Sequence, residues 1–152
     1  MALDNIDLRI LSLMQTKANL SVAQIAEEVN LSQPPCWRRI KKLEAKGYID
    51  GRVTILNRKM LGLNIVVYTE VKLTSNGRQG VDKFEDTISS FPEVAECYGM
   101  LGRSDYLLRI VARDMDHYDR FFQDHLSKIP GVQDITSAVA LREVKYSTEL
   151  PI

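Results

Sequence analysis

The sequence predicts an α+β protein in two parts, a helical N-terminal domain followed by a domain of alternating strands and helices. Apolar residues recur at helical spacing through residues 3–47, and they change to strand-like alternation from residue 64. Two similar segments, ISSFPEV at 88–94 and LSKIPGV at 126–132, stand where a predicted helix gives way to a strand. A proline in each segment ends the helix before the next strand. This echo predicts a second domain with two similar halves.

The first predicted helix covers residues 3–16. Asp4 stands at its N-cap and Asp7 lies in its first turn, where a negative charge is favourable. An apolar stripe at helical spacing follows and predicts the buried face of the helix: Ile6, Ile10, Leu13 and Met14.

Serines mark the starts of the next two helices. Ser21 precedes Gln24 at capping-box spacing, so each side chain can satisfy a backbone N–H of the other. We expect Ser32 to cap the third helix in the same way, with two prolines in the first turn, where a missing N–H costs little. Asn30 between the helices tolerates a left-handed turn. A helix, a short turn and a basic helix make the layout of a helix-turn-helix.

A short hairpin is expected after the third helix. Gly47 ends that helix, and residues 48–49 and 53–56 read as two strands around a turn at Asp50-Gly51. Three helices followed by a hairpin predict a winged helix-turn-helix domain over residues 1–57.

The remainder of the chain predicts a ferredoxin-like plait. Residues 58–63 form a short polar connection that is not rich in Gly and Ser, which favours a limited range of domain orientations. Strands are expected at 64–73, 93–101, 105–112 and 132–144, and helices are expected at 81–91 and 115–126. The order βαββαβ over residues 64–152 is that of the split βαβ fold.

Charge and cysteine content narrow the class of protein. The net charge is zero, yet residues 1–59 carry ten Lys and Arg against six Asp and Glu, whereas residues 60–152 carry ten against fourteen. This split indicates a basic nucleic-acid-binding domain on an acidic body. Two widely spaced cysteines form neither a metal-ligand pattern nor a disulfide framework, which fits a reducing cytosol. The N-terminus lacks the features of a signal peptide, and no apolar run approaches the roughly 20 residues of a membrane span. We therefore expect a soluble, cytoplasmic protein.

The third helix is the predicted DNA-binding element. Arg and Lys side chains on one helix face can neutralise phosphates, and Arg can read guanine edges. A solvated surface helix is the alternative, but the preceding helix, the serine caps and the following hairpin favour DNA. Gln33 near the helix N-terminus can pair with adenine, while Trp37 contacts a sugar or a thymine methyl group or else packs half-buried on the core. The predicted double-stranded DNA contacts are Ser32, Gln33, Pro34, Trp37, Arg38, Arg39, Lys41, Lys42 and, in the hairpin, Arg52.

A second candidate site is the turn within GMLGRSDYLLRI, residues 99–110. Backbone N–H groups there could hold the carboxylate of a small zwitterion, and Asp105 could hold its amino group. From the residues alone, an ordinary β-turn explains the segment better. His117 and His125 lack the i, i+4 spacing of a helical metal pair. No catalytic residue, metal site or cofactor is predicted, so the chain is not expected to be an enzyme.

These segments together resemble the Lrp/AsnC family, the feast/famine regulators, over essentially the whole chain. The matching stretches are LDNIDLRILSLMQ, LSQPPCWRRIKKLEAKGYI, LGRSDYLLRI and IPGVQDITSAVALREVKYSTELPI. Ser32, Pro34, Cys36 and Arg39 match the recognition-helix pattern of the family. The effector-turn pattern is matched by Gly102, Asp105 and Tyr106.

The resemblance implies a winged-helix DNA-binding domain joined to a regulatory plait of the RAM type that dimerises through its sheet. It implies further assembly, often to an octamer (a tetramer of dimers), and an amino-acid effector held near dimer–dimer contacts at residues Gly102, Arg103, Ser104, Asp105 and Tyr106. At Arg103 and Ser104 the chain departs from many relatives, and the added cation favours a ligand carboxylate.

The resulting interpretation is a homo-oligomeric regulator of amino-acid metabolism that binds a pseudo-palindromic operator. Two other classes remain open. One is a metabolite-binding oligomer without specific operator recognition, which would show no salt-dependent preference among duplexes. The other is a small enzyme on a plait fold, which would show turnover.

Overall fold

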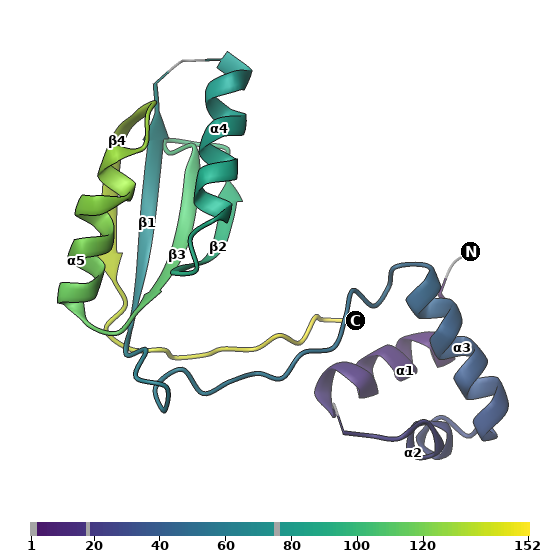
Figure 1. Cartoon of the computed structure of the whole chain (residues 1–152). Coiled ribbons are helices and arrows are strands. Elements are labelled where there is room, and N and C mark those ends of the chain that lie inside the picture. Colours follow the sequence, from purple (N-terminus) through teal and green to yellow (C-terminus); the bar gives the residue numbers. More distant parts are fainter. Residues whose placement is uncertain (1–2, 18, 75–76) are drawn as a thin grey trace. The chain divides into compact units, whose positions relative to one another are not determined.

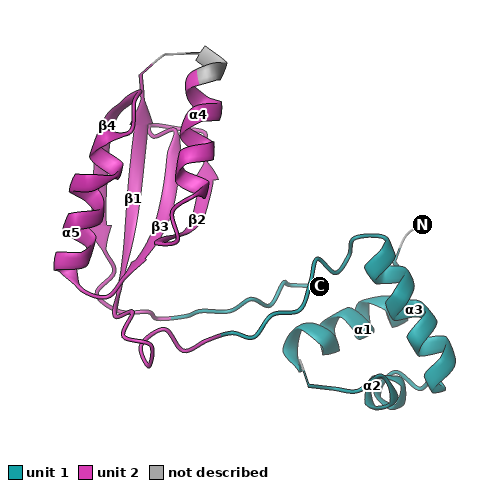
Figure 2. Ribbon diagram, in the orientation of Figure 1, with its two compact units in different colours: residues 1–55, 145–152 teal, residues 56–144 magenta. Residues whose placement is uncertain are grey.

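The computed structural model describes residues 3–17, 19–74 and 77–152. The chain divides into two compact units, residues 1–55 with 145–152 and residues 56–144 (Figure 2). The first boundary lies close to the expected one at residue 57. The C-terminal tail, residues 145–152, was expected in the second domain and instead belongs to the first unit. It does so because the side chain of Gln15 binds the backbone of Leu150.

Three helices build the first unit: α1 (Asn5–Thr16), α2 (Val22–Glu28) and α3 (Gln33–Ala45) (Figure 1). Capping boxes open the first two. Asp4 caps α1 in a reciprocal pair with Asp7, and Ser21 caps α2 in the same way with Gln24. Both predicted helix starts are therefore confirmed.

The start of α3 differs from the prediction. Ser32 has the extended backbone of an N-cap residue, but its side chain makes no capping hydrogen bond. An N-cap hydroxyl accepts from the N–H of the second or third helical residue. In α3 those residues are Pro34 and Pro35, which have no N–H. The prolines thus leave the Ser32 hydroxyl without a partner at the helix end.

The core of this unit forms where the three helices meet. Asn30 and Gly47 both adopt positive φ, 56° and 73°, which turns the chain between α2 and α3 and after α3. The buried side chains are Ile10, Ile25, Ala26, Val29, Cys36, Ile40 and Leu43.

The predicted hairpin after α3 is absent as regular structure: residues 48–57, all of them described, contain no strand. A two-stranded hairpin by itself is marginally stable. Here its apolar side chains have little to pack against, because Val53 is 86% exposed and Leu56 is 67% exposed. The segment therefore runs as an irregular connection.

The second unit contains β1 (Ile65–Leu73), α4 (Gly77–Ser89), β2 (Val94–Gly99), β3 (Tyr106–Ala112), α5 (Met115–Asp124), a 3₁₀ turn η1 (Leu126–Lys128) and β4 (Val132–Val139). The strands form one antiparallel sheet in the order β2-β3-β1-β4. This confirms the βαββαβ plait. The last strand ends at Val139 rather than at 144, because only Ala140 continues its pairing with β1.

Both helices of the plait cover the same face of the sheet (Figure 1). Phe84 and Ile88 of α4 and Phe121 of α5 share one buried cluster with the inward residues of β1 and β3. Within it, Thr69 is fully buried, and its hydroxyl lies 3.3 Å from that of Tyr118 and 3.1 Å from that of Ser137. The opposite face of the sheet carries no helix of this unit. Among the described residues, no helix is both long and apolar enough to cross a membrane.

Candidate functional site

The N-terminal half of α3 presents the predicted base-reading residues. Ser32, Gln33, Pro34 and Arg38 are exposed, and Trp37 keeps 50% of its surface exposed. Trp37 is thus half-buried and lies outside the buried core cluster of this unit, so both alternatives for it stay open. Arg38 makes no hydrogen bond or ion pair with any residue that the structure describes, so its guanidinium is available to an external partner.

Arg39 has a different environment from the one expected of a DNA contact. Its guanidinium lies 2.7 Å from a carboxylate oxygen of Asp4 and 2.7 Å from one of Asp7, both on the first turn of α1. The two carboxylates raise the pKa of Arg39, with Asp4 contributing more. The Asp7 side chain is only 6% exposed. Arg39 is thus a bridge between α3 and α1 rather than an unpaired cation, and its predicted DNA contact stays a prediction.

Two other predicted phosphate contacts share one carboxylate. Lys41 Nζ lies 2.7 Å from Glu44, and Arg52 lies 3.4 Å from the other oxygen of the same group. The hydrogen bond from Lys41 is the main cause of the lowered pKa of Glu44. Both cations remain more than half exposed, and Lys42 is exposed beside them. The C-terminal half of α3 is therefore a partly neutralised basic surface.

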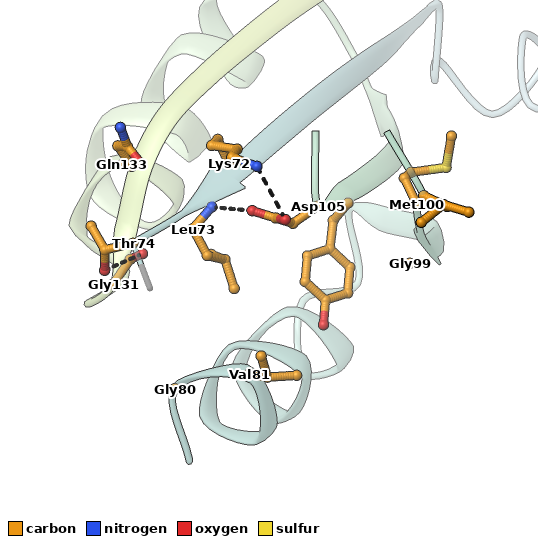
Figure 3. Close-up of a pocket in the computed structure, with 12 residues that line it drawn as sticks. Lys72, Leu73, Thr74, Gly80, Val81, Gly99, Met100, Asp105, Gly131 and Gln133 are labelled. Atoms are coloured by element: carbon orange, nitrogen blue, oxygen red, sulfur yellow. Dashed lines mark hydrogen bonds and ion pairs between the residues drawn. The ribbon is translucent and has the colours of Figure 1, made fainter. Parts of the chain in front are cut away.

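The second unit contains a cavity of about 800 Å³ where β1 and β3 meet near α4 (Figure 3). Backbone from β2 and from the turn before β4 completes its wall. The lining residues are Lys72, Leu73, Thr74, Gly80, Val81, Gly99, Met100, Leu101, Asp105, Tyr106, Gly131 and Gln133. Among these described lining residues, Lys72 and Asp105 are the charged ones, and they have opposite signs.

Asp105 is already engaged on this wall. One carboxylate oxygen accepts the N–H of Leu73 at 2.7 Å, and the other lies 3.4 Å from Lys72 Nζ (Figure 3). The Leu73 N–H, followed by Lys72, holds the pKa of Asp105 below its ordinary value. The pairing of β1 with β3 ends at Val71 and Tyr106, so the Leu73 N–H lies just beyond that ladder and is taken by the Asp105 side chain. Asp105 therefore fixes the end of β1 and keeps an anionic oxygen beside Lys72.

Tyr106 forms part of the same wall from inside the core. It is 6% exposed, and its hydroxyl donates to Glu85 of α4 at 2.6 Å. Burial is the largest cause of a strongly raised pKa for Tyr106, with Glu85 adding to it. The tyrosine stays neutral and holds β3 against α4.

The predicted effector turn is divided between two cavities. Asp105 and Tyr106 line the larger one, whereas Gly102, Arg103 and Ser104 line a neighbouring cavity of about 270 Å³. Ser104 donates to Glu70 there at 2.5 Å. Arg103 thus does not line the larger cavity, and it gives no reason for an acidic ligand in it.

Several lining residues were not predicted from the sequence. Lys72 and Thr74 at the end of β1, and Gly131 and Gln133 at the start of β4, come together because the two strands pair. Thr74 fixes this junction through its backbone N–H, which donates to the carbonyl of Gly131 at 2.8 Å. The repeated segment that contains IPGV, residues 129–132, marks the turn before β4 and was the sequence feature that could have predicted this part of the cavity wall.

Two family models match the chain in order. A winged helix-turn-helix DNA-binding model matches residues 3–50, and an Lrp/AsnC ligand binding domain matches residues 66–150. The chain is 37% identical over 150 residues to the DNA-binding transcriptional activator DecR of Escherichia coli K12, covering 99% of each chain.

Solved structures agree over nearly the whole length. An AsnC family transcriptional regulator from Agrobacterium tumefaciens shares 40% identity and a TM-score of 0.93, covering 98% of this chain and 97% of that one. A transcriptional regulator from Neisseria meningitidis in complex with L-Met shares 32% identity and a TM-score of 0.94, covering 99% and 97%. The helical unit matches a DNA-binding model, the plait matches a ligand-binding model, and the relatives match both over nearly their whole length. This chain therefore belongs to the Lrp/AsnC family of transcriptional regulators.

Proposed function

We propose that the chain binds a specific operator through the exposed face of α3. The observation that supports this most directly is the N-terminal half of that helix. The Ser32 hydroxyl and the Arg38 guanidinium have no partner among the described residues, and both are exposed beside Gln33. Unengaged donors at a helix N-terminus suit phosphate oxygens and base edges.

The contacts divide by position along α3. Gln33, Pro34, Trp37 and Arg38 lie at the end that enters the groove and read bases, while Ser32 donates to a phosphate. Lys41, Lys42 and Arg52 supply sequence-independent attraction to the backbone, weakened for Lys41 and Arg52 by Glu44. Arg39 is excluded from the interface because Asp4 and Asp7 hold it.

Fluorescence anisotropy on a duplex selected from random sequence tests this division. Gln33→Ala should relax base choice at one position, worth about 1–3 kcal/mol of discrimination. Arg38→Ala should weaken binding, and Lys42→Ala should reduce the salt slope by about one. Gln123→Ala, at an exposed position of α5 in the other unit, serves as the control and should change neither affinity nor base preference. If Gln33→Ala and Arg38→Ala both bind with unchanged affinity and base preference, a different face of the helical unit contacts DNA.

The cavity beside Asp105 is the proposed effector site, and an α-amino acid is the proposed effector. Lys72 can bind a carboxylate, and the free side of Asp105 can accept an ammonium group. Leu73, Val81 and Met100 offer apolar contacts to a side chain. The relative from Neisseria meningitidis that carries L-Met supports the ligand class.

A thermal-shift panel of the twenty amino acids tests this site, because a ligand that binds the folded state raises the melting temperature. We expect amino acids with uncharged side chains to give the largest shifts. Asp105→Asn keeps an acceptor for the Leu73 N–H and removes the charge, so it should abolish the shift while operator binding persists. Arg103→Gln, outside this cavity, is the matched control and should retain the shift. Loss of the shift in Arg103→Gln alone would move the site to the neighbouring cavity.

The chain is also proposed to act as a dimer, with assembly to an octamer. Support comes from the helix-free face of the sheet, where Tyr68 is 43% exposed and stands opposite Arg109 and Ala138 of the adjacent strands. A two-layer domain with one uncovered sheet face leaves a surface that a second copy can cover. Two copies would present two α3 helices to the two halves of a pseudo-palindrome.

A further inference from the structure

In the described part of the chain, the hydrogen bonds from the helical unit to the C-terminal tail come from one side chain. Gln15, near the end of α1, donates from Nε2 to the carbonyl of Leu150 at 2.9 Å. Its Oε1 accepts the backbone N–H of Leu150, also at 2.9 Å. One amide thus satisfies both backbone groups of one residue, as a neighbouring β-strand does.

The contact recognises backbone rather than side chain. Leu150 is 66% exposed, and Tyr146 and Ile152 are also more than half exposed, so apolar burial contributes little. Local bonds shape the tail for this contact: the Glu149 N–H donates to Ser147 Oγ at 3.1 Å, and the Ile152 N–H donates to the Leu150 carbonyl at 3.0 Å. These local bonds order the tail around Leu150, the residue whose backbone N–H and carbonyl the Gln15 amide binds.

A second observation places more of the tail against the same unit. Thr148 lines a cavity of about 290 Å³ together with Met14 and Leu20 from the helical core and Val53 from the segment after α3. Arg52, one of the proposed phosphate contacts, lines the same cavity. The docked tail therefore adjoins both α1 and a proposed DNA-contacting segment.

The tail is continuous with the last strand of the plait. Ala140 still bonds to Val66 of β1 at 2.9 Å, and only residues 141–144 separate it from the tail. The two units are thus joined covalently near residue 56 and again near residue 144. If the tail stays docked, a change at the end of β4 reaches the helical unit through this second connection.

We propose that residues 145–152 are a tether that docks on the Gln15 amide of the same chain and carries the effector response from the plait to the DNA-binding unit. The regulatory half of this proposal rests on the function proposed above, whereas the docking half does not. An amino acid bound in the cavity contacts the start of β4, and the tail continues from the other end of that strand, so a shift of the whole strand is what reaches the tail. The docked tail passes that change to the unit that contains α3.

Docking is tested by hydrogen exchange on the full-length chain. The Leu150 amide should be protected in the wild type and should lose that protection in Gln15→Ala, with at least a tenfold faster exchange. Gln123→Ala is the matched control, since Gln123 also stands next to last in its helix, α5, and its side chain has no hydrogen bond to the described part of the chain. Exchange of the Leu150 amide at the rate of an unstructured peptide in the wild type would overturn the proposal. Unchanged protection in Gln15→Ala would overturn it equally.

Coupling is tested with a pair of tail variants. Leu150→Pro removes the N–H that Gln15 accepts, whereas Leu150→Ala removes the same side chain and keeps the N–H. Operator Kd is measured with and without each of the twenty amino acids, together with the thermal shift. Allosteric coupling typically changes affinity by about 5–150-fold. The measure of coupling is the ratio of operator Kd with the amino acid to operator Kd without it. We expect Leu150→Ala to keep the wild-type ratio and Leu150→Pro to bring this ratio toward one, with the thermal shift retained in both.

The outcomes separate the two proposals. If the Kd ratio is the same in Leu150→Pro and in the wild type, the tail is not the route of coupling. A wild type whose operator Kd responds to none of the amino acids overturns the regulatory function proposed above. In that case the exchange of the Leu150 amide still decides whether the tail docks.

Discussion

Arg38 and Arg39 are adjacent in the sequence and differ in their surroundings. Arg38 is exposed with no partner among the residues described, while Arg39 bridges α3 to two aspartates at the start of α1. We therefore propose that the same residue type serves DNA binding at Arg38 and stabilises the helical unit at Arg39. Substitution of each should separate these two roles.

Arg39→Ala should destabilise the helical unit, because it leaves the buried carboxylate of Asp7 without its partner. The expected cost is about 1–3 kcal/mol in the free energy of unfolding. Urea unfolding followed by circular dichroism measures it. Arg38→Ala is the control and should leave the unfolding midpoint unchanged while weakening DNA binding. Equal stability of the two variants would contradict the role of the Arg39 bridge.

The same cluster predicts an acid-sensitive contribution to stability. The Asp7 backbone N–H, and next the Arg39 guanidinium, hold the pKa of Asp4 below its ordinary value of 3.8. A carboxyl with a lowered pKa in the folded state stabilises the fold above its unfolded pKa, and this contribution is lost as the pH falls through the folded value. The stability difference between wild type and Arg39→Ala should therefore be largest above about pH 5 and shrink below pH 4. Unfolding midpoints measured across pH 3–7 check this, and a difference that stays constant would contradict it.

At the scale of helices, the N-termini of α2 and α3 use serine differently. In α2 the Ser21 hydroxyl accepts a hydrogen bond from the Gln24 N–H at 3.2 Å. In turn, Gln24 Oε1 accepts a hydrogen bond from the Ser21 N–H. In α3 the prolines after Gln33 remove the donors that Ser32 would need. The second serine is therefore free for another partner.

Ser21→Ala should cost about 1 kcal/mol of stability, the usual value of a lost N-cap. Ser32→Ala should cost almost none and should instead weaken operator binding, because its hydroxyl is proposed to contact a phosphate. Thermal melts and anisotropy titrations of both variants give the comparison. A large loss of stability in Ser32→Ala would show that its hydroxyl supports the helix after all.

At the scale of the whole molecule, the plait is a two-layer domain with one bare sheet face. Its helices share a single core with the inner face, and the outer face exposes Tyr68 beside Arg109. A charge placed at the centre of a self-association surface is costly to bury. A charged residue introduced at Tyr68 therefore tests whether this face mediates self-association.

Tyr68→Glu should lower the mass of the assembly, measured by light scattering after gel filtration. It should also reduce operator affinity, because a separated chain offers one helical unit to the operator instead of two. Met115→Glu is the control, since Met115 is 50% exposed at the start of α5 in the same unit. An unchanged mass in Tyr68→Glu would place the association surface elsewhere.

Much of this architecture follows from local sequence patterns. The helices of the first unit, the order of strands and helices along the plait and the caps at Asp4 and Ser21 depend on residues a few positions apart, so periodicity and spacing predict them. The uncapped Ser32 was also readable from the sequence, because the prolines that follow it have no N–H. The hairpin failed as a prediction because a turn signal does not provide the packing that a two-stranded ribbon needs.

The sequence by itself therefore determined the order of elements, the helix-turn-helix with its basic third helix, and the plait with its turn before Asp105. Only the tertiary structure decided which charged groups are free and which residues share a cavity. Arg39 meets Asp4 across 35 positions, Asp105 meets Leu73 across 32, and Gln15 meets Leu150 across 135. Such partners depend on how separate elements pack, and no spacing within one helix or strand specifies them.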